Sequence, residues 1–182
     1  YRNIVKRSPL YPITSLMTCG IINGQIYQVI PTAGEDFVHE TRSFFANGTN
    51  CQELYITPER MTDQHWQAIA DGAKFARENE MLLADSHWIG GDPGKGEIYG
   101  WASWSKNQGI LVLRNPSEKT ASISIDLQNA FELPQKAQKE YILKDPWQEN
   151  QITPAIKLNA GKNHSFDLSG FQVIVLKATA IK

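Results

Sequence analysis

The chain has 182 residues, of which 41% are hydrophobic and 20% charged, and its formal net charge is -1. This balance is typical of a globular protein with one domain or two small ones. Because no basic block is present, nucleic acid is not an expected partner. The apolar runs are also far too short to predict a membrane-spanning segment.

The sequence opens on Tyr1, and the charged segment that follows is interrupted by prolines, which predicts a piece of a longer protein. Two cysteines, Cys19 and Cys51, are too few to define a disulfide framework. They would form a disulfide only if their parts of the fold met, and the expected state is two free, buried thiols.

Helices alternate with short apolar runs in the first 85 residues. Residues 13–22 fit a short buried helix as well as a strand, and residues 26–30 form an apolar run within a loop. A helix is predicted over residues 35–47 because aromatic side chains recur on one face, and Gly48 suits a left-handed cap at its end. The aromatic face consists of Phe37, Phe44 and Phe45.

A short strand over residues 52–57 and a long helix over residues 62–80, capped by Thr62, complete this part. The predicted buried face of the long helix consists of Trp66, Ile69, Ala70, Ala73 and Ala76. Short apolar strands that alternate with helices are typical of βα units with buried parallel strands. About 85 residues hold one or two such units, whereas a complete (β/α)8 barrel needs ~250.

The pattern changes after residue 85. A glycine-rich loop spans residues 90–96, and apolar residues then alternate with polar ones, most clearly over residues 120–127. Strands are predicted at residues 97–104, 109–115, 120–127, 139–144, 152–158 and 171–178. This spacing predicts an antiparallel β-sandwich over residues 86–182. The expected fold class is α+β, with the terminal βα units of a (β/α)8-type barrel in residues 1–85.

Histidines and carboxylates give few indications of chemistry. No two histidines have the spacing of a metal site, so neither a metal nor another cofactor is expected. Glu53, Asp85 and Asp92 lie near expected strand ends, where a glycosidase places its carboxylates. The alternative for Asp92 is a turn residue of the glycine-rich loop.

Several aromatic residues surround the same loop. Trp88 precedes the glycines, and Tyr99 and Trp101 follow on one face of an expected strand, with Trp104 on the other face. An exposed aromatic pair offers flat apolar surfaces on which a sugar ring can stack. The alternative is packing within the core and between the two parts, with Trp88 filling the junction.

Residues 44–85 resemble the end of the catalytic barrel in the α-galactosidase-like glycoside hydrolases of families 27 and 36. The matching positions are Phe45, Gly48, Leu54, Thr62, Trp66, Lys74 and Arg77. Residues 96–117, with the Arg-Asn-Pro run at 114–116, resemble the start of the antiparallel β-domain that closes these enzymes. The nearest resemblance is to large bacterial proteins related to the α-galactosidases.

The resemblance implies a retaining glycoside hydrolase that acts on α-linked galactosides or similar glycans in the periplasm or outside the cell. In these families the nucleophile and the acid/base aspartate follow the fourth and sixth barrel strands, which would lie upstream of Tyr1. No catalytic residue is therefore expected here, and the chain alone should be inactive. The predicted substrate contacts are Glu53, Trp88, Asp92, Tyr99 and Trp101.

Two alternatives to this function stay open. One is a carbohydrate-binding module that uses Tyr99 and Trp101. The other is a structural domain that covers the barrel, with a large apolar surface on residues 1–85 through which the chain associates with itself.

Overall fold

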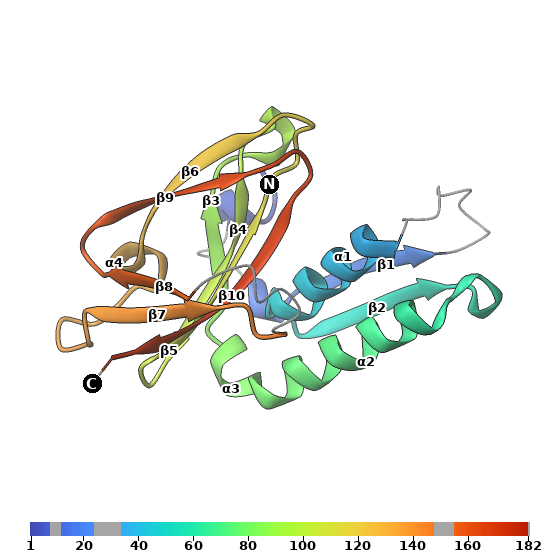
Figure 1. Ribbon diagram of the computed structural model, residues 1–182, viewed down its shortest axis with the longest axis horizontal. Helices are drawn as coiled ribbons and strands as arrows, with labels where there is room; N and C mark the ends of the chain where they lie inside the picture. The colour runs from blue at the N-terminus through green and yellow to red at the C-terminus, as the bar shows by residue number, and fades with distance from the viewer. Residues whose placement is uncertain (8–11, 24–33, 148–154, 182) are drawn as a thin grey trace.

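The computed structural model describes residues 1–7, 12–23, 34–147 and 155–181. It confirms an α+β fold, in which a parallel strand pair and two long helices extend away from a group of antiparallel strands (Figure 1). The helices and 3-10 turns are η1 (Val5–Arg7), η2 (Ile13–Ser15), α1 (Gly34–Ala46), η3 (Pro58–Arg60), α2 (Asp63–Glu78), α3 (Glu80–Leu83), η4 (Pro93–Lys95) and α4 (Leu127–Ala130). The strands are β1 (Met17–Asn23), β2 (Cys51–Ile56), β3 (His87–Gly90), β4 (Tyr99–Ser105), β5 (Gln108–Arg114), β6 (Ala121–Asp126), β7 (Glu140–Lys144), β8 (Ile156–Asn159), β9 (Asn163–Leu168) and β10 (Val173–Ala180).

Strands β1 and β2 form a parallel two-stranded sheet in which Cys19 lies opposite Glu53. Residues 13–22, which the sequence leaves between helix and strand, are a 3-10 turn followed by β1. Helix α1 lies between the two strands in the chain, which is the long crossover that parallel pairing requires. The predicted apolar run at residues 26–30 lies outside the described residues.

Helix α1 forms because its aromatic side chains share one face. Phe37, Phe44 and Phe45 are all buried, as predicted, and Gly48 adopts a left-handed φ of 78° just beyond the helix. The helix packs against α2, β1 and β10. It therefore connects the parallel pair to the antiparallel part of the molecule.

Helix α2 begins at the predicted cap, where the Thr62 side chain accepts a hydrogen bond from the His65 backbone N–H. The predicted buried face is right in part, since Ile69, Ala73 and Ala76 are half-buried and pack against the aromatic core, but its other two members are not buried. Trp66 is 43% exposed and Ala70 is exposed, while the buried side consists of His65, Ala68, Gly72 and Phe75. The face turns toward α1 at Gly72 because only a residue without a side chain leaves room there for the ring of Phe45.

The larger antiparallel sheet has six strands in the order β3-β4-β5-β10-β7-β8. At its centre, β5 is buried from Gly109 to Leu113. Ile110 and Val112 pack with residues of α2 and α3, whereas Leu111 and Leu113 belong to the core on the opposite face. Burial on both faces explains why this strand is a continuous apolar run rather than an alternating one.

A second antiparallel sheet, formed by β6 and β9, encloses that core. Ile125 of β6 and Phe166 and Leu168 of β9 pack with Tyr141 and Leu143 of β7. The alternation predicted for residues 120–127 is confirmed, since Ser122 and Ser124 are exposed between more buried apolar neighbours.

Sequence reasoning missed β3 and β9. The four residues of β3 run directly into the glycines, and the loop that follows is the connection of a hairpin, since β3 pairs with β4. Gly90 and Gly96 have φ values of 84° and 73°, which a residue with a side chain rarely adopts.

Strand β9 does have an alternating apolar pattern in the sequence, since Phe166 and Leu168 lie on one face. Of the strand predicted over residues 152–158, residues 152–154 lie outside the described part, and β8 begins at Ile156.

Candidate functional site

Three of the predicted substrate contacts meet in one aromatic cluster, formed by Trp88, Tyr99 and Trp101 on β3 and β4. The rings of Trp88 and Tyr99 are stacked with centroids 4.8 Å apart, and Trp101 meets both edge-on at 5.6 and 5.7 Å. Tyr1 lies 5.9 Å from Trp88 on the outside of the cluster. All three cluster rings are half-buried, so the cluster is neither a fully exposed platform nor a closed core.

The indole nitrogen of Trp88 is a distinctive feature of the cluster. Nε1 is buried and has no hydrogen-bond partner within the described residues. A buried donor without a partner costs free energy, so this atom is a natural contact for water or a ligand oxygen.

Arg114 links the aromatic cluster to α1. It lies opposite Tyr99 in the β4–β5 pairing, donates a hydrogen bond of 2.6 Å to Ser43 Oγ and forms an ion pair with Glu40. Burial lowers the pKa of Arg114, but the negative charge of Glu40 and the nearby Tyr99 hydroxyl outweigh this, so the pKa is raised. The guanidinium thus stays charged and holds the sheet against the helix.

Trp104 points away from this cluster, as predicted. Its Nε1 donates a hydrogen bond of 3.0 Å to the hydroxyl of Tyr141, inside the sandwich core. Burial raises the pKa of Tyr141, against a smaller lowering by the bond from Trp104. The pair has a structural role.

Glu53 lies in a different group, on the parallel pair. Its Oε2 accepts hydrogen bonds from the Tyr55 hydroxyl at 2.8 Å and from Cys19 Sγ at 3.4 Å. The bond to Glu53 is the largest cause that raises the pKa of Tyr55 to about 12, and it raises the pKa of Cys19 in the same way. We call these three residues the Glu53 trio.

Cys19 and Cys51 are free, as expected, but both are exposed, so the prediction of burial is wrong. They share with Glu53 the side of the β1–β2 sheet that faces away from the helices. On the other side, Gly20 contacts Phe44, and Gln52 Nε2 donates to the Phe44 carbonyl at 2.7 Å. Among the described residues the side that carries the thiols is open.

Asp92 is a turn residue of the glycine-rich loop, which was the alternative to a substrate contact. Its Oδ1 accepts a hydrogen bond of 2.9 Å from the Gly94 N–H and caps η4, while its own N–H donates to Glu97 Oε2 at 2.7 Å. These contacts shape the hairpin loop. The predicted site residues therefore fall into an aromatic cluster, the Glu53 trio and a turn.

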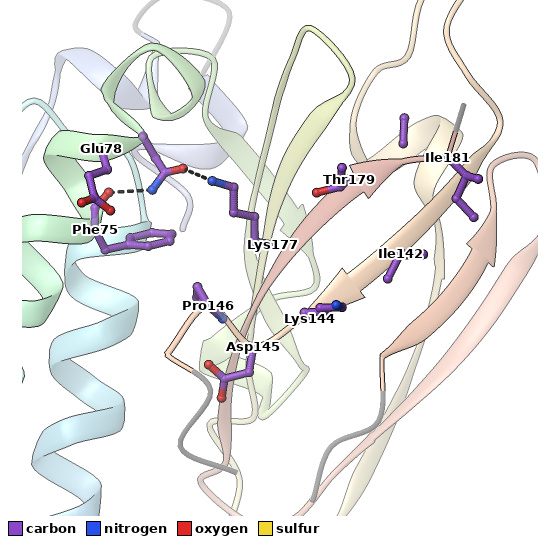
Figure 2. A pocket seen from close by; sticks show the side chains of 11 residues that line it. Phe75, Glu78, Ile142, Lys144, Asp145, Pro146, Lys177, Thr179 and Ile181 are labelled. Atoms are coloured by element: carbon purple, nitrogen blue, oxygen red, sulfur yellow. Dashed lines mark hydrogen bonds between the residues drawn. The ribbon is translucent and has the colours of Figure 1, made fainter. Parts of the chain in front are cut away.

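Sequence reasoning missed a hollow of about 530 Å³ beyond the end of α2. Figure 2 shows Lys177 extending from the sheet toward α2, with Lys144, Asp145 and Pro146 on the neighbouring strand end. No local pattern predicts this hollow, because its walls come from α2, β7 and β10, which lie far apart in the chain.

Within the part of the chain that the structure describes, no group of three His, Cys, Asp or Glu side chains is arranged to hold a metal ion. The same part contains no helix with the length and apolar character needed to cross a membrane.

No protein-family model matches the sequence, and neither does any curated protein. The fold, however, is similar to that of solved glycosidases. A maltogenic α-amylase from Thermotoga neapolitana aligns with a TM-score of 0.63 and 12% identity over 99% of this chain. A family 27 β-L-arabinopyranosidase from Geobacillus stearothermophilus aligns at 0.57 and 11% over 91%, and an α-galactosidase from Saccharomyces cerevisiae at 0.59 and 7% over 82%.

The chain spans 45%, 37% and 44% of the length of these three enzymes, respectively. At such low identities the likeness shows the fold alone. That fold is shared with α-galactosidases and α-amylase-like glycosidases, in agreement with the resemblance seen in the sequence.

Proposed function

We propose that this chain is the C-terminal portion of a retaining, α-galactosidase-like glycoside hydrolase. In this proposal, residues 1–85 are the last one or two βα units of its barrel, and residues 86–182 are the β-sandwich that closes it. The chain supports and completes the barrel, and the catalytic carboxylates belong to the rest of the parent enzyme. The glycan substrate is an α-galactoside or a related sugar.

The observation that carries this proposal is the open parallel pair. Parallel sheets in proteins are covered on both faces, yet β1 and β2 have helices on one side only. The other side carries the Glu53 trio and the exposed Met17. Additional parallel strands beside β1 and β2 would satisfy both edges and turn the trio toward a barrel interior.

The Glu53 trio and the aromatic cluster make different contributions to the proposal. Tyr55 is the last residue but one of β2 and Glu53 lies two residues before it, toward the end of a barrel strand at which substrate is bound. In the aromatic cluster, Trp88 and Tyr99 cover each other's facing surfaces, which leaves less area for a sugar ring. A binding module built on Tyr99 and Trp101 is therefore the weaker alternative.

The test is hydrolysis of an aryl α-galactoside. We expect this chain alone to release no aryl alcohol above the uncatalysed rate, because in this proposal both catalytic carboxylates lie in the rest of the parent enzyme. The longer protein, expressed from the same gene, is expected to turn over the substrate with retained anomeric configuration, measured by NMR. Steady turnover by this chain alone, or no turnover by the longer protein on any α-glycoside, would overturn the proposal.

A further inference from the structure

The hollow beyond the end of α2 has the character of a binding site. Its volume of about 530 Å³ lies within the range of small-molecule sites, ~300–1,000 Å³. The sheet contributes Ile142 of β7 and Thr179 of β10, which lie opposite each other, and the helix contributes Phe75. A ligand here would touch the apolar side chain of Ile142 and the small part of Phe75 that is not buried in the core.

Two lysines line the hollow, beside the carboxylates of Glu78 and Asp145. Lys144 and Lys177 lie directly opposite each other in the pairing of β7 with β10, and like charges in this arrangement destabilise a sheet. Neither forms an ion pair within the described residues. An anion between the two ammonium groups would relieve their repulsion.

The carboxylates that line the hollow are engaged in other contacts. Glu78 lies 3.9 Å from Lys74 on the outer surface of α2, and Asp145 Oδ1 accepts a hydrogen bond of 2.8 Å from the Trp147 N–H. Lys177 is held instead by a neutral group, since its Nζ donates to Asn79 Oδ1 at 2.7 Å (Figure 2). The Asn79 amide is fixed in turn by its bond of 2.7 Å to the Phe75 carbonyl.

This arrangement leaves Lys177 oriented but not neutralised. One of its three N–H donors is used by Asn79, and two remain for a ligand. The contact with Asn79 also fastens the end of α2 to the sheet, so Lys177 has a structural role as well. Lys144 is exposed and has no such role, which makes it the better residue for a test.

We propose that this hollow binds a uronic acid residue of an acidic glycan. The sugar carboxylate lies between Lys144 and Lys177, the C–H face of its ring contacts Phe75 and Ile142, and ring hydroxyls bond to Thr179. A small inorganic anion would satisfy the lysines but leave the apolar walls uncovered. This site is distinct from the Glu53 trio and does not depend on the proposed hydrolase function.

The proposal is tested by calorimetric titration of this chain with digalacturonic acid at low salt. We expect saturable binding that weakens as sodium chloride is added, because salt screens the exposed lysine charges. The neutral counterpart, α-1,4-galactobiose, and acetate are both expected to bind at least about tenfold more weakly. Galactobiose lacks the carboxylate that contacts the lysines, and acetate lacks the sugar ring that contacts the apolar side chains.

Variants identify the place of binding. Lys144→Met should weaken digalacturonate binding about tenfold or more, which is the usual worth of a charge-assisted hydrogen bond. Lys162→Met, an exposed lysine in the β8–β9 turn, is the matched control and should leave binding unchanged. Equal binding of galactobiose or of acetate, an unaffected Lys144→Met variant with the same thermal unfolding as the parent chain, or no digalacturonate binding at millimolar concentration would overturn the proposal.

Discussion

At the scale of single residues, Glu53 determines the protonation of its neighbours. Its carboxylate accepts hydrogen bonds from Tyr55 and Cys19, and both donors must keep their protons to make these bonds. The pKa of each donor is therefore raised. For an exposed thiol the consequence is chemical, because only the thiolate reacts with alkylating agents.

We predict that Glu53→Gln makes Cys19 more reactive. An amide accepts a weaker hydrogen bond and carries no charge, so the pKa of Cys19 should fall toward its ordinary value. At a pH below the pKa, a lower pKa means a larger thiolate fraction and therefore faster alkylation. The measurement is the rate of Cys19 alkylation against pH in a Cys51→Ser background, so that a single thiol is followed.

The control for this experiment is Glu140→Gln, which removes a carboxylate that pairs with Lys157 on β8. It should leave the pH profile of Cys19 unchanged. An identical profile for Glu53→Gln would show that the carboxylate does not hold the thiol proton.

The Glu53 trio also shows what a sequence can predict at this scale. Glu53 was identified as a candidate from its place near a strand end, but its partner Cys19 lies 34 residues earlier. Only the parallel register of β1 and β2 brings the two together. The exposure of both thiols was mispredicted for the same reason, since it depends on which strands lie beside them.

At the scale of elements, the contact between α1 and α2 shows why periodicity alone gave only part of the buried face of α2. Apolar spacing correctly indicated Ile69, Ala73 and Ala76, which are half-buried against the core, but also favoured the exposed Trp66 and Ala70 and missed Gly72, on which the contact is centred. Close helix packing needs a small residue at the crossing. A search for apolar side chains does not find such a position, because glycine has no side chain. Helix α1 was predicted correctly because its large aromatic residues themselves form the buried face.

We predict that Gly72→Ala destabilises the protein. In an exposed helix interior this change stabilises by ~1 kcal/mol through helix propensity. Here the new Cβ would overlap the Phe45 ring, so we expect a net loss of ~1–3 kcal/mol in the free energy of unfolding, typical of an overpacked site. Chemical denaturation measures the difference.

Ala70→Gly provides the matched control on the same helix. Ala70 is exposed, so the reverse substitution should cost only the propensity term of ~1 kcal/mol. A stabilised Gly72→Ala variant would mean that the Phe45 ring moves aside without cost and that α1 and α2 are loosely packed.

At the scale of the whole molecule, exposed large apolar side chains are unevenly distributed. Among the described residues, those in the first part are Tyr1, Ile4, Met17, Leu54, Trp66 and Met81, and the only large one beyond residue 85 is Phe171. The sandwich part therefore buries its large apolar residues more completely than the helical part. The division into residues 1–85 and 86–182 remains a prediction, and this asymmetry supports it.

The antiparallel strands were largely predictable because the alternation of apolar and polar residues along a strand indicates which of its faces is buried. β6 is the clearest example, with serines on its exposed side. The open face of β1 and β2 was not predictable in the same way, because what covers a parallel strand is another part of a chain. The same face motivates the last prediction.

We predict that this chain associates with itself through the open β1–β2 sheet. Within the described residues, each strand of this sheet has only the other as a pairing partner, so each leaves one edge open, and Met17 on the open face is 55% exposed. The apparent mass measured by light scattering after size exclusion should therefore rise with protein concentration.

Met17→Lys should reduce this rise, because a charged edge residue opposes strand pairing. Phe171→Lys removes a side chain of comparable exposure (67%) outside residues 1–85 and should leave the rise unchanged. A concentration-independent monomer, or association abolished by Phe171→Lys and not by Met17→Lys, would place the interface elsewhere or remove it.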